Sequence, residues 1–485
     1  MRYLSPTLAT IVLFAPSGAN AHAFGQRYDL PLPLWMFIWG GAIAVLLSFV
    51  VMAIFMKHTP RADSYPRYSL LNNPIGKFVT QPITTGIIRL IFTGLFLLII
   101  AAGFWGQQSP LVNISTVMVW VIAWVGLAFI CAFLGNFWQL INPWRALFGH
   151  AERCYKKLTT NELSNHRPYP PALGYWPAFI FFLSFAWLEI NWPGASTPSS
   201  VATALTIYTA LTFIGMFVYG REVWLKHAEC FTVVYTLFAK FAITEGSLGP
   251  KKREWFLRPP GIGLRHQKDE LPSLTMMFFV LLLLSTVTYD GFTETSTFKD
   301  AALTYYYFLK DITGDGLGTA ALSLVDTSGL ISFPILFIIV YLFFIGLIAF
   351  IDGETKDVLK LARIFVFSII LISIAYHLSH YASLLLIEGQ LAIRLASDPF
   401  GYGWDLFGTA AYKSDIAIIN AKFVWYFSVI LIVIGHIVAV YIAHAEALRF
   451  YGDRHRALIS QIPMVVLMVS YTMLSLWIIA QPIVG

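Results

Sequence analysis

Residues 34–55 decide the fold, and they read LWMFIWGGAIAVLLSFVVMAIF. The stretch carries no charged side chain, and as an α-helix rising about 1.5 Å per residue it is long enough to cross a bilayer core of about 30 Å. Similar apolar runs follow at Ile83–Trp105, Val112–Leu134, Tyr175–Trp192, Val201–Tyr219, Leu271–Tyr289, Leu330–Ile351, Ala362–Ile387, Ala421–Ala445 and Gln461–Ile483. The sequence therefore predicts an all-α polytopic membrane protein, a bundle of about ten transmembrane helices.

The composition agrees with a protein that has the lipid bilayer as its main partner. Of the 485 residues, 58% are hydrophobic and 12% are charged, whereas soluble domains have roughly 25% charged residues. The net charge of +6 does not indicate a nucleic-acid partner, because most basic residues lie in loops between apolar runs. Cys131, Cys154 and Cys230 have no spacing typical of a metal site.

The N-terminus has the pattern of a secretory signal peptide. Arg2 is followed by a short apolar run, roughly residues 8–15, and then by Ala19-Asn20-Ala21, a small-x-small cleavage site. Cleavage after residue 21 makes His22 the mature N-terminus and leaves residues 22–485 as one transmembrane helical domain. The alternative is an uncleaved anchor.

Loop charges predict the orientation of the chain. Every odd-numbered loop between the predicted spans is basic, whereas lysine and arginine are sparse in the even-numbered loops. The positive-inside rule therefore places the odd loops, including a long loop at 221–270, in the cytoplasm of a bacterial inner-membrane protein. The mature N- and C-termini and two long loops, 291–329 and 388–420, are then periplasmic. These two loops are either packed caps on the bundle or substrate lids.

Three shorter features bear on the cytoplasmic side. The apolar stretch Phe231–Ile243 inside the long cytoplasmic loop is expected to lie along the membrane surface. Arg89, near the start of the second span, is expected to extend toward the cytoplasmic interface. The motif Asn142-Pro143-Trp144-Arg145 after the third span is interpreted as structural anchoring.

Histidines in the eighth and ninth spans are candidate metal ligands, because ionisable groups inside spans are costly. His377 and His380 share one helical face, and His436 is on the next helix, which we expect to pack antiparallel. His377 and His436 would then differ in depth by about 9 Å, so joint ligation of a metal or haem requires a shifted or tilted helix. His444 is expected to be a separate feature near the cytoplasmic interface. The alternative for these histidines is interhelical hydrogen bonding.

Carboxylates near the periplasmic ends of the spans are candidate catalytic residues. Glu189 and Asp290 both follow long, mostly apolar runs and could act as a base or as metal ligands. Histidine with carboxylate suits a hydrolytic Zn²⁺, Mn²⁺ or Co²⁺, and the amine and imidazole of a mature N-terminal His22 suit Cu²⁺. The alternative is simple exposure of these carboxylates at the wet ends of the spans.

Several segments together resemble a bacterial family of polytopic membrane proteins often labelled fenitrothion hydrolase. They are Gly25–Pro33, Asn142–Ala146, Thr286–Phe292, His380-Tyr381 with Gly389-Gln390, Ser397–Pro399 with Gly403–Thr409, Gly435-His436 and Ala443-His444. The resemblance covers nearly the whole mature chain in motif order and implies hydrolysis of organophosphate triesters, without assigning catalytic residues. This chain has Ala445-Glu446 where relatives tend to have Asp-Arg, which weakens a role for that position.

Three functions follow as hypotheses. The first is a membrane-embedded hydrolase of small apolar phosphotriesters, in which a metal held by His377, His380 and His436 activates water and Asp290 or Glu189 serves as ligand or base. The second is a transporter or metal-handling protein in which the same residues form a proton or copper path. The third is a haem-binding or scaffold subunit of a membrane complex.

Overall fold

The computed structural model describes residues 28–56, 65–248, 253–265, 271–314, 320–355 and 357–484. Within these ranges the chain is almost entirely helical, and nine helices are long and apolar enough to cross a membrane. The fourth predicted span is a shorter apolar helix of 15 residues, α8 (Trp176–Ile190). The predicted all-α membrane fold is confirmed, while the predicted signal peptide and His22 lie outside the described residues.

Most of the long helices begin and end close to the predicted positions. The long helices are α1 (Leu34–Phe55), α3 (Pro82–Trp105), the continuous run α4 (Ile114–Thr116), η4 (Val117–Gly126) and α5 (Leu127–Phe133), α9 (Pro198–Tyr219), α12 (Leu274–Thr293), α14 (Ala320–Asp352), α15 (Val358–Ile387), α17 (Ala421–Tyr451) and α19 (Ile462–Val484). As exceptions, α14 begins at Ala320 rather than at Leu330, and α17 ends at Tyr451 rather than at Ala445. Proline at the first turn of α3, α8 and α9 suits these starts, because an N-terminal turn does not need its amide hydrogen.

Shorter elements connect these helices. The α-helices are α2 (Pro74–Val79), α6 (Trp138–Ile141), α7 (Pro143–Thr159), α10 (Arg221–His227), α11 (Cys230–Phe238), α13 (Ser296–Thr313), α16 (Leu391–Ser397) and α18 (Arg454–Ser460). The 3₁₀ turns are η3 (Leu70–Asn72), η5 (Pro193–Ser196), η6 (Ile262–Leu264) and η8 (Glu388–Gln390), and the strands are β1 (Tyr68–Ser69), β2 (Thr244–Leu248) and β3 (Arg253–Leu257).

The three strands form a small antiparallel sheet in the order β1-β3-β2. Glu245 on β2 supports it by accepting hydrogen bonds from Arg258 (2.8 Å) and from the Tyr65 hydroxyl (2.8 Å) and by pairing with Arg67 (3.1 Å). The sheet joins the segment after α1 to the segment after α11, so these two segments lie on the same side of the bundle. This sheet was not predicted from the sequence.

Helix α11 differs from its predicted position along the membrane surface. Most of its side chains are buried, including Tyr235, Leu237 and Phe238. The Tyr235 hydroxyl donates a hydrogen bond of 2.6 Å to the backbone oxygen of Ala123, in the middle of the third span. The short apolar helix therefore inserts between spans, because burial of its apolar faces against other helices is favourable.

The two long loops of the predicted periplasmic side contain helical elements. Much of 291–329 is helical, because α12 extends to Thr293, α13 follows, and α14 begins at Ala320. The 388–420 segment begins with η8 and α16 and then packs as an irregular cap. Gln107 N donates to Phe400 O (2.9 Å), and Ile114 N donates to Pro399 O (3.2 Å). The packed-cap alternative therefore describes this second segment.

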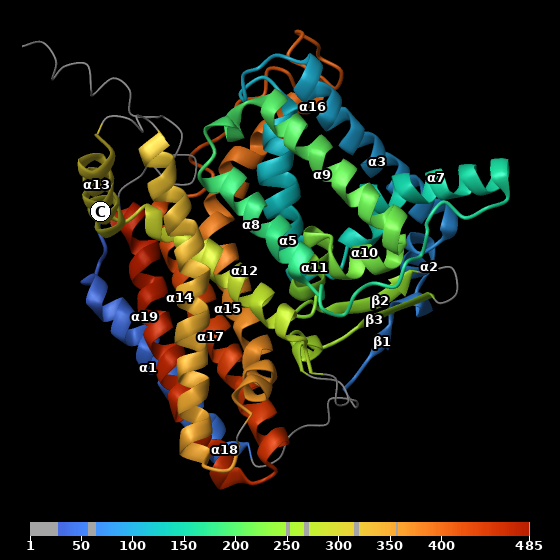
Figure 1. Cartoon of the computed structure of the whole chain (residues 1–485). Coiled ribbons are helices and arrows are strands. Elements are labelled where there is room, and N and C mark those ends of the chain that lie inside the picture. The colour runs from blue at the N-terminus through green and yellow to red at the C-terminus, as the bar shows by residue number, and fades with distance from the viewer. Residues whose placement is uncertain are drawn as a thin grey trace, which may run out of the picture.

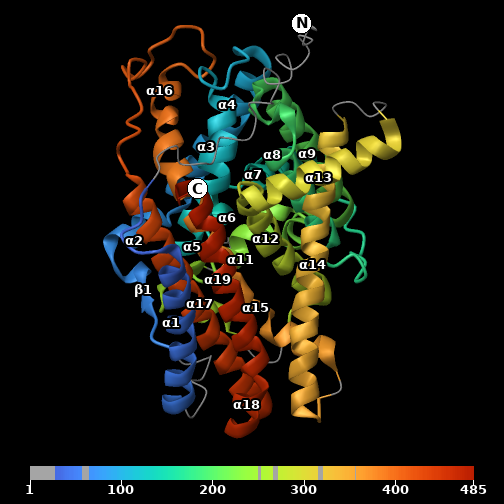
Figure 2. The ribbon, with the colours of Figure 1, turned by 90° about the vertical axis from the view of Figure 1, so that its left-hand side faces the viewer.

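The long helices form two groups that meet near the centre of the molecule. Figure 1 shows α1, α14, α15, α17 and α19 on one side and α3, α5, α8 and α9 on the other, and Figure 2 looks at the molecule from the side of the first group. α12 packs against α15 of the first group and α8 of the second, and α15 also contacts η4. α15 is buried along nearly its whole length, so polar groups on α15 lie inside the protein.

α15 and α17 pack closely and antiparallel, as expected from the sequence. The hydroxyls of Ser379 and Ser428 each donate to the other residue's backbone oxygen, at 3.4 and 3.3 Å. Farther along the contact, a Cβ at Gly435 would lie 2.4 Å from the Cβ of Ala375. Small residues allow this close approach of two helix backbones, and they fix the depth of His436 relative to His377.

Candidate intramembrane acid–base site

Asp290 lies near the end of α12 and is the centre of the site. His380 Nε2 lies 2.9 Å from its Oδ2, and the Tyr381 hydroxyl donates a hydrogen bond of 2.7 Å to the same oxygen. The side chains of Asp290 and His380 are only 8% and 10% exposed. An aspartate, a histidine and a tyrosine thus meet in the protein interior, where charge is stabilised by partners rather than by water.

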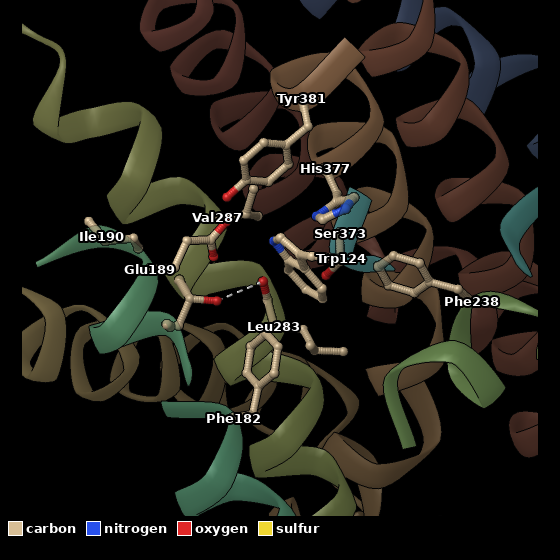
Figure 3. Close-up of a pocket in the computed structure, with 12 residues that line it drawn as sticks. Trp124, Phe182, Glu189, Ile190, Phe238, Leu283, Val287, Ser373, His377 and Tyr381 are labelled. Atoms are coloured by element: carbon tan, nitrogen blue, oxygen red, sulfur yellow. Dashed lines mark hydrogen bonds between the residues drawn. The ribbon is translucent and has the colours of Figure 1, made fainter. Parts of the chain in front are cut away.

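Glu189, at the end of α8, brings a second carboxylate to the same place. It is close enough to Asp290 for the two charges to interact, and Tyr381 and Trp124 both approach its carboxylate. In Figure 3 the Tyr381 hydroxyl and the indole nitrogen of Trp124 point toward the Glu189 side chain. Tyr381 therefore stands between the two carboxylates that the sequence analysis selected as catalytic candidates.

These groups border a small cavity between the two helix groups. Its lining includes Glu189, Tyr381, His377, Trp124 and Phe238, from α8, α15, η4 and α11. The cavity volume is about 20 Å³, which is enough for one or two water molecules. The geometry therefore suits an enclosed water next to a carboxylate rather than a bound organic substrate.

His377 faces this cavity from one turn below His380. Its ring packs against Trp124 (4.8 Å between ring centres), Tyr381 (4.7 Å) and Phe238 (5.6 Å). Its Nε2 is buried and has no hydrogen-bond partner within the described parts of the chain. A buried imidazole nitrogen beside a cavity of this size is a place for a water molecule or a transferred proton.

Trp124 comes from an unusual part of the third span. Residues 117–126 are π-helical, and π-helical segments are rare and frequent at functional sites. The indole nitrogen of Trp124 is buried and lies beside Glu189, and it makes no well-formed hydrogen bond to any residue that the structure describes. Trp124 and Tyr381 were not among the site residues predicted from the sequence, although Tyr381 directly follows the candidate His380.

The predicted metal ligands do not gather at one point. His436 packs against Tyr471 (5.8 Å between ring centres), and its Nδ1 bonds to the Ile432 backbone oxygen, whereas His377 faces Trp124 and Phe238. No group of three or more His, Cys, Asp or Glu side chains with a metal-binding arrangement occurs in the described ranges. His380 pairs with Asp290, and His377 lines the cavity, so the structure unites these histidines with the predicted acids instead.

Two further buried polar groups lie away from this site. His444 contacts Gln461, with Nδ1 at 2.9 Å from its amide nitrogen and 3.2 Å from its amide oxygen.

The second group is Glu229, which was not predicted from the sequence. Its carboxylate caps α11 by accepting hydrogen bonds from Thr232 N (2.8 Å) and Phe231 N (3.0 Å). It also accepts a hydrogen bond from the Tyr208 hydroxyl (2.7 Å). Asn142 of the anchoring motif donates to the Glu229 carboxylate (3.5 Å) and to Thr232 (3.1 Å). That cluster holds α11 in place.

Comparison of the chain with protein-family models, with curated protein sequences and with solved structures finds no match in any of the three.

Proposed function

We propose that this protein carries protons across the membrane, with the Asp290–His380 pair as the proton-binding centre and Glu189 and His377 as its neighbours in the path. The observation that carries this proposal is the convergence of Asp290, His380 and Tyr381 at 2.9 and 2.7 Å. Buried chains of Asp, Glu and His in spanning helices are typical of the proton relays of pumps and transporters.

The chemistry of the centre supports exchange of a proton between several neighbouring groups. Two carboxylates lie close together, and a single proton shared among them and His380 relieves their repulsion. Tyr381 can donate to either carboxylate, and a water in the 20 Å³ cavity can link Glu189 to the unpartnered Nε2 of His377. Each step is then a short transfer between hydrogen-bonding atoms.

The orientation belongs to the same proposal. By the loop charges, the ends of α8 and α12 that carry Glu189 and Asp290 face the periplasm of a bacterial inner membrane. The centre is then reached from the periplasmic side, and the basic loops with the small sheet lie in the cytoplasm. The cap formed by residues 388–420 is on the periplasmic side in this arrangement.

The test is proton flux in proteoliposomes that contain a pH-sensitive dye, driven by a potassium gradient with valinomycin. Wild-type protein is expected to change the internal pH faster than protein-free liposomes. The Asp290→Asn and Glu189→Gln variants are expected to reduce the rate to that of the protein-free control. Glu388→Gln is the matched control, because Glu388 is exposed at the end of the same helix as His380. A wild-type rate equal to that of empty liposomes, or unchanged by both variants, overturns the proposal.

The hydrolase that the family resemblance implies has one supporting observation of its own. A histidine oriented by a carboxylate, as His380 is by Asp290, is the arrangement of a general base. A phosphotriester is much larger than the cavity of about 20 Å³, so this activity requires the helix groups to open. Release of the nitrophenol product from fenitrothion by purified protein, lost in Asp290→Asn, would support it, and absence of turnover with metal-loaded protein would exclude it.

A further inference from the structure

A second unusual site lies around Arg89 on α3, at the other end of the helix group formed by α3, α5, α8 and α9. Its Nε is buried without a hydrogen-bond partner, and within the described ranges its guanidinium has no acidic partner. Arg89 lies about two turns into α3, at a depth where a charged side chain without a partner is costly.

The nearest charges make this position more electropositive. Arg145 at the start of α7 and Arg221 at the start of α10 are close enough to act on Arg89 electrostatically. Arg145 pairs with Glu222 (2.7 Å), and Arg221 pairs with Glu152 (2.9 Å) and with Glu222 (3.3 Å). Two of the three guanidinium groups therefore pair with the two carboxylates, whereas Arg89 pairs with neither. One positive charge is left uncompensated among these five side chains.

Packing holds the cluster in shape. A Cβ at Gly149 would lie 2.2 Å from Arg221 Nη1, so the guanidinium of Arg221 rests against the backbone of α7. Only glycine leaves that space. The ion pairs and this contact together fix the position of two guanidinium groups before any ligand arrives, which lowers the entropic cost of binding.

The surface around Arg89 faces lipid. The neighbouring α3 side chains Ile83, Ile87, Leu90 and Ile91 are between 53% and 73% exposed, and in a membrane protein such a helix face is solvated by acyl chains. Nearby, α7 is strongly amphipathic and exposes Arg153, Lys156 and Lys157. A basic amphipathic helix of this type lies at the headgroup level and attracts anionic lipids.

We propose that Arg89 binds the phosphate of an acidic phospholipid, whose headgroup lies among Arg89, Arg145 and Arg221 and whose acyl chains lie along the exposed face of α3. Guanidinium binds phosphate through paired hydrogen bonds, and basic pockets between membrane helices are known headgroup sites. This site is independent of the proton-carrying centre and needs no movement of the helices.

The experiment measures lipid retention by native mass spectrometry of purified, delipidated protein mixed with equal amounts of phosphatidylglycerol and phosphatidylcholine. Wild-type protein is expected to retain phosphatidylglycerol in preference to phosphatidylcholine. Arg89→Gln is expected to lower phosphatidylglycerol occupancy by at least about tenfold, the lower end of the effect of losing one hydrogen bond to a charged group. Arg167→Gln, which changes an exposed arginine next to the end of α9, is expected to leave occupancy unchanged.

Three results would each overturn the proposal. The first is equal phosphatidylglycerol retention by wild type and Arg89→Gln. The second is equal retention of the two lipids by wild type. The third is displacement of phosphatidylglycerol by inorganic phosphate at similar concentration, which would make the cluster a site for soluble anions. If Arg89→Gln fails to fold, Arg89→Lys keeps the charge but not the paired geometry, and it is expected to retain the lipid less well than wild type.

Discussion

The hydroxyl of Tyr381 makes contacts with two carboxylates, and these contacts can be separated from the packing of the Tyr381 ring. It donates to Asp290 at 2.7 Å and approaches Glu189, while the ring packs on His377 and His380. Tyr381→Phe keeps the ring and removes the bridge between the two acids. We expect proton flux in proteoliposomes to fall about tenfold, because a hydrogen bond to a charged group contributes roughly 1.5–3 kcal/mol.

Tyr341→Phe is the matched control for that variant. Tyr341 is equally buried, but its hydroxyl donates to the backbone oxygen of Ala362 (2.7 Å) on another part of α15. Its removal is expected to cost about 1 kcal/mol of stability and to leave proton flux unchanged. Equal flux in the two variants would show that the Tyr381 hydroxyl has no part in the proton path.

His227 lies at the end of α10, outside the spanning helices, and its surroundings predict how the stability of the protein depends on pH. Its ring stacks on Tyr169 (5.4 Å) and contacts Tyr175 (5.3 Å), and burial lowers its pKa below the ordinary value, with a further contribution from Lys226. The folded protein therefore prefers the neutral ring. Stability from this group is present above the pKa of the unfolded chain and is lost as the pH falls through the lower folded-state pKa.

We expect the thermal unfolding midpoint of the wild type to decrease when the pH is lowered from 7.5 to a value below the ordinary histidine pKa of about 6.5. His227→Phe keeps an aromatic ring between the two tyrosines without a titrating group. The unfolding midpoint of this variant is expected to decrease less than that of the wild type over the same pH interval. Differential scanning fluorimetry at the two pH values measures this. Parallel losses in the two proteins would contradict the assignment.

Sequence alone selected Asp290, Glu189, His377 and His380, because ionisable residues stand out within apolar runs. Their contacts were not predictable, since they depend on how α8, α12 and α15 cross. Trp124 was missed because aromatic residues make up 16% of the chain and one more carries little signal. Glu229 was missed because its segment has the composition of a loop connection, although the structure buries it.

At the scale of elements, the contact between α15 and α17 depends on Gly435. An added Cβ would meet Ala375 Cβ at 2.4 Å, so Gly435→Ala must separate the two helix backbones. We expect a loss of about 1–3 kcal/mol, the usual cost of overpacking a well-packed interior, with a lower thermal unfolding midpoint in detergent.

Gly346→Ala on α14 is the control for that substitution. A Cβ there meets nothing within 4 Å, and alanine is the better helix former by about 1 kcal/mol. Its midpoint is expected to equal or exceed that of the wild type. If both variants lower the midpoint by the same amount, the close approach of α15 and α17 is not what Gly435 provides.

The spans themselves were predictable because length and apolar composition determine them. The exceptions are short elements whose position depends on partners. α11 has the composition of a surface-lying amphipathic segment, yet Tyr235 and Glu229 tie it to other helices inside the bundle. The π-helical geometry of residues 117–126 leaves no trace in periodicity, because a run that is apolar on every face shows no preferred period.

At the scale of the whole molecule, the proposed proton-carrying centre lies where two helix groups meet. α12 and α15 contact each other, α12 also packs on α8, and α15 on η4. Sites at such junctions respond to small movements of one group against the other. The location therefore suits a centre whose access could alternate between the two sides of the membrane, provided that the chain is oriented as the loop charges predict.

The natural cysteines allow that orientation to be tested with little modification. Cys154 on α7 is exposed, whereas Cys131 and Cys230 are buried. If α7 is cytoplasmic, a membrane-impermeant maleimide is expected to leave Cys154 unlabelled in intact spheroplasts and to label it after permeabilisation. The reverse reporter is Lys413→Cys in a Cys154→Ser background, because Lys413 is exposed in the 388–420 cap. That cysteine is expected to react before permeabilisation, and labelling of Cys154 in intact spheroplasts would invert the predicted topology and move Asp290 and Glu189 to the cytoplasmic side.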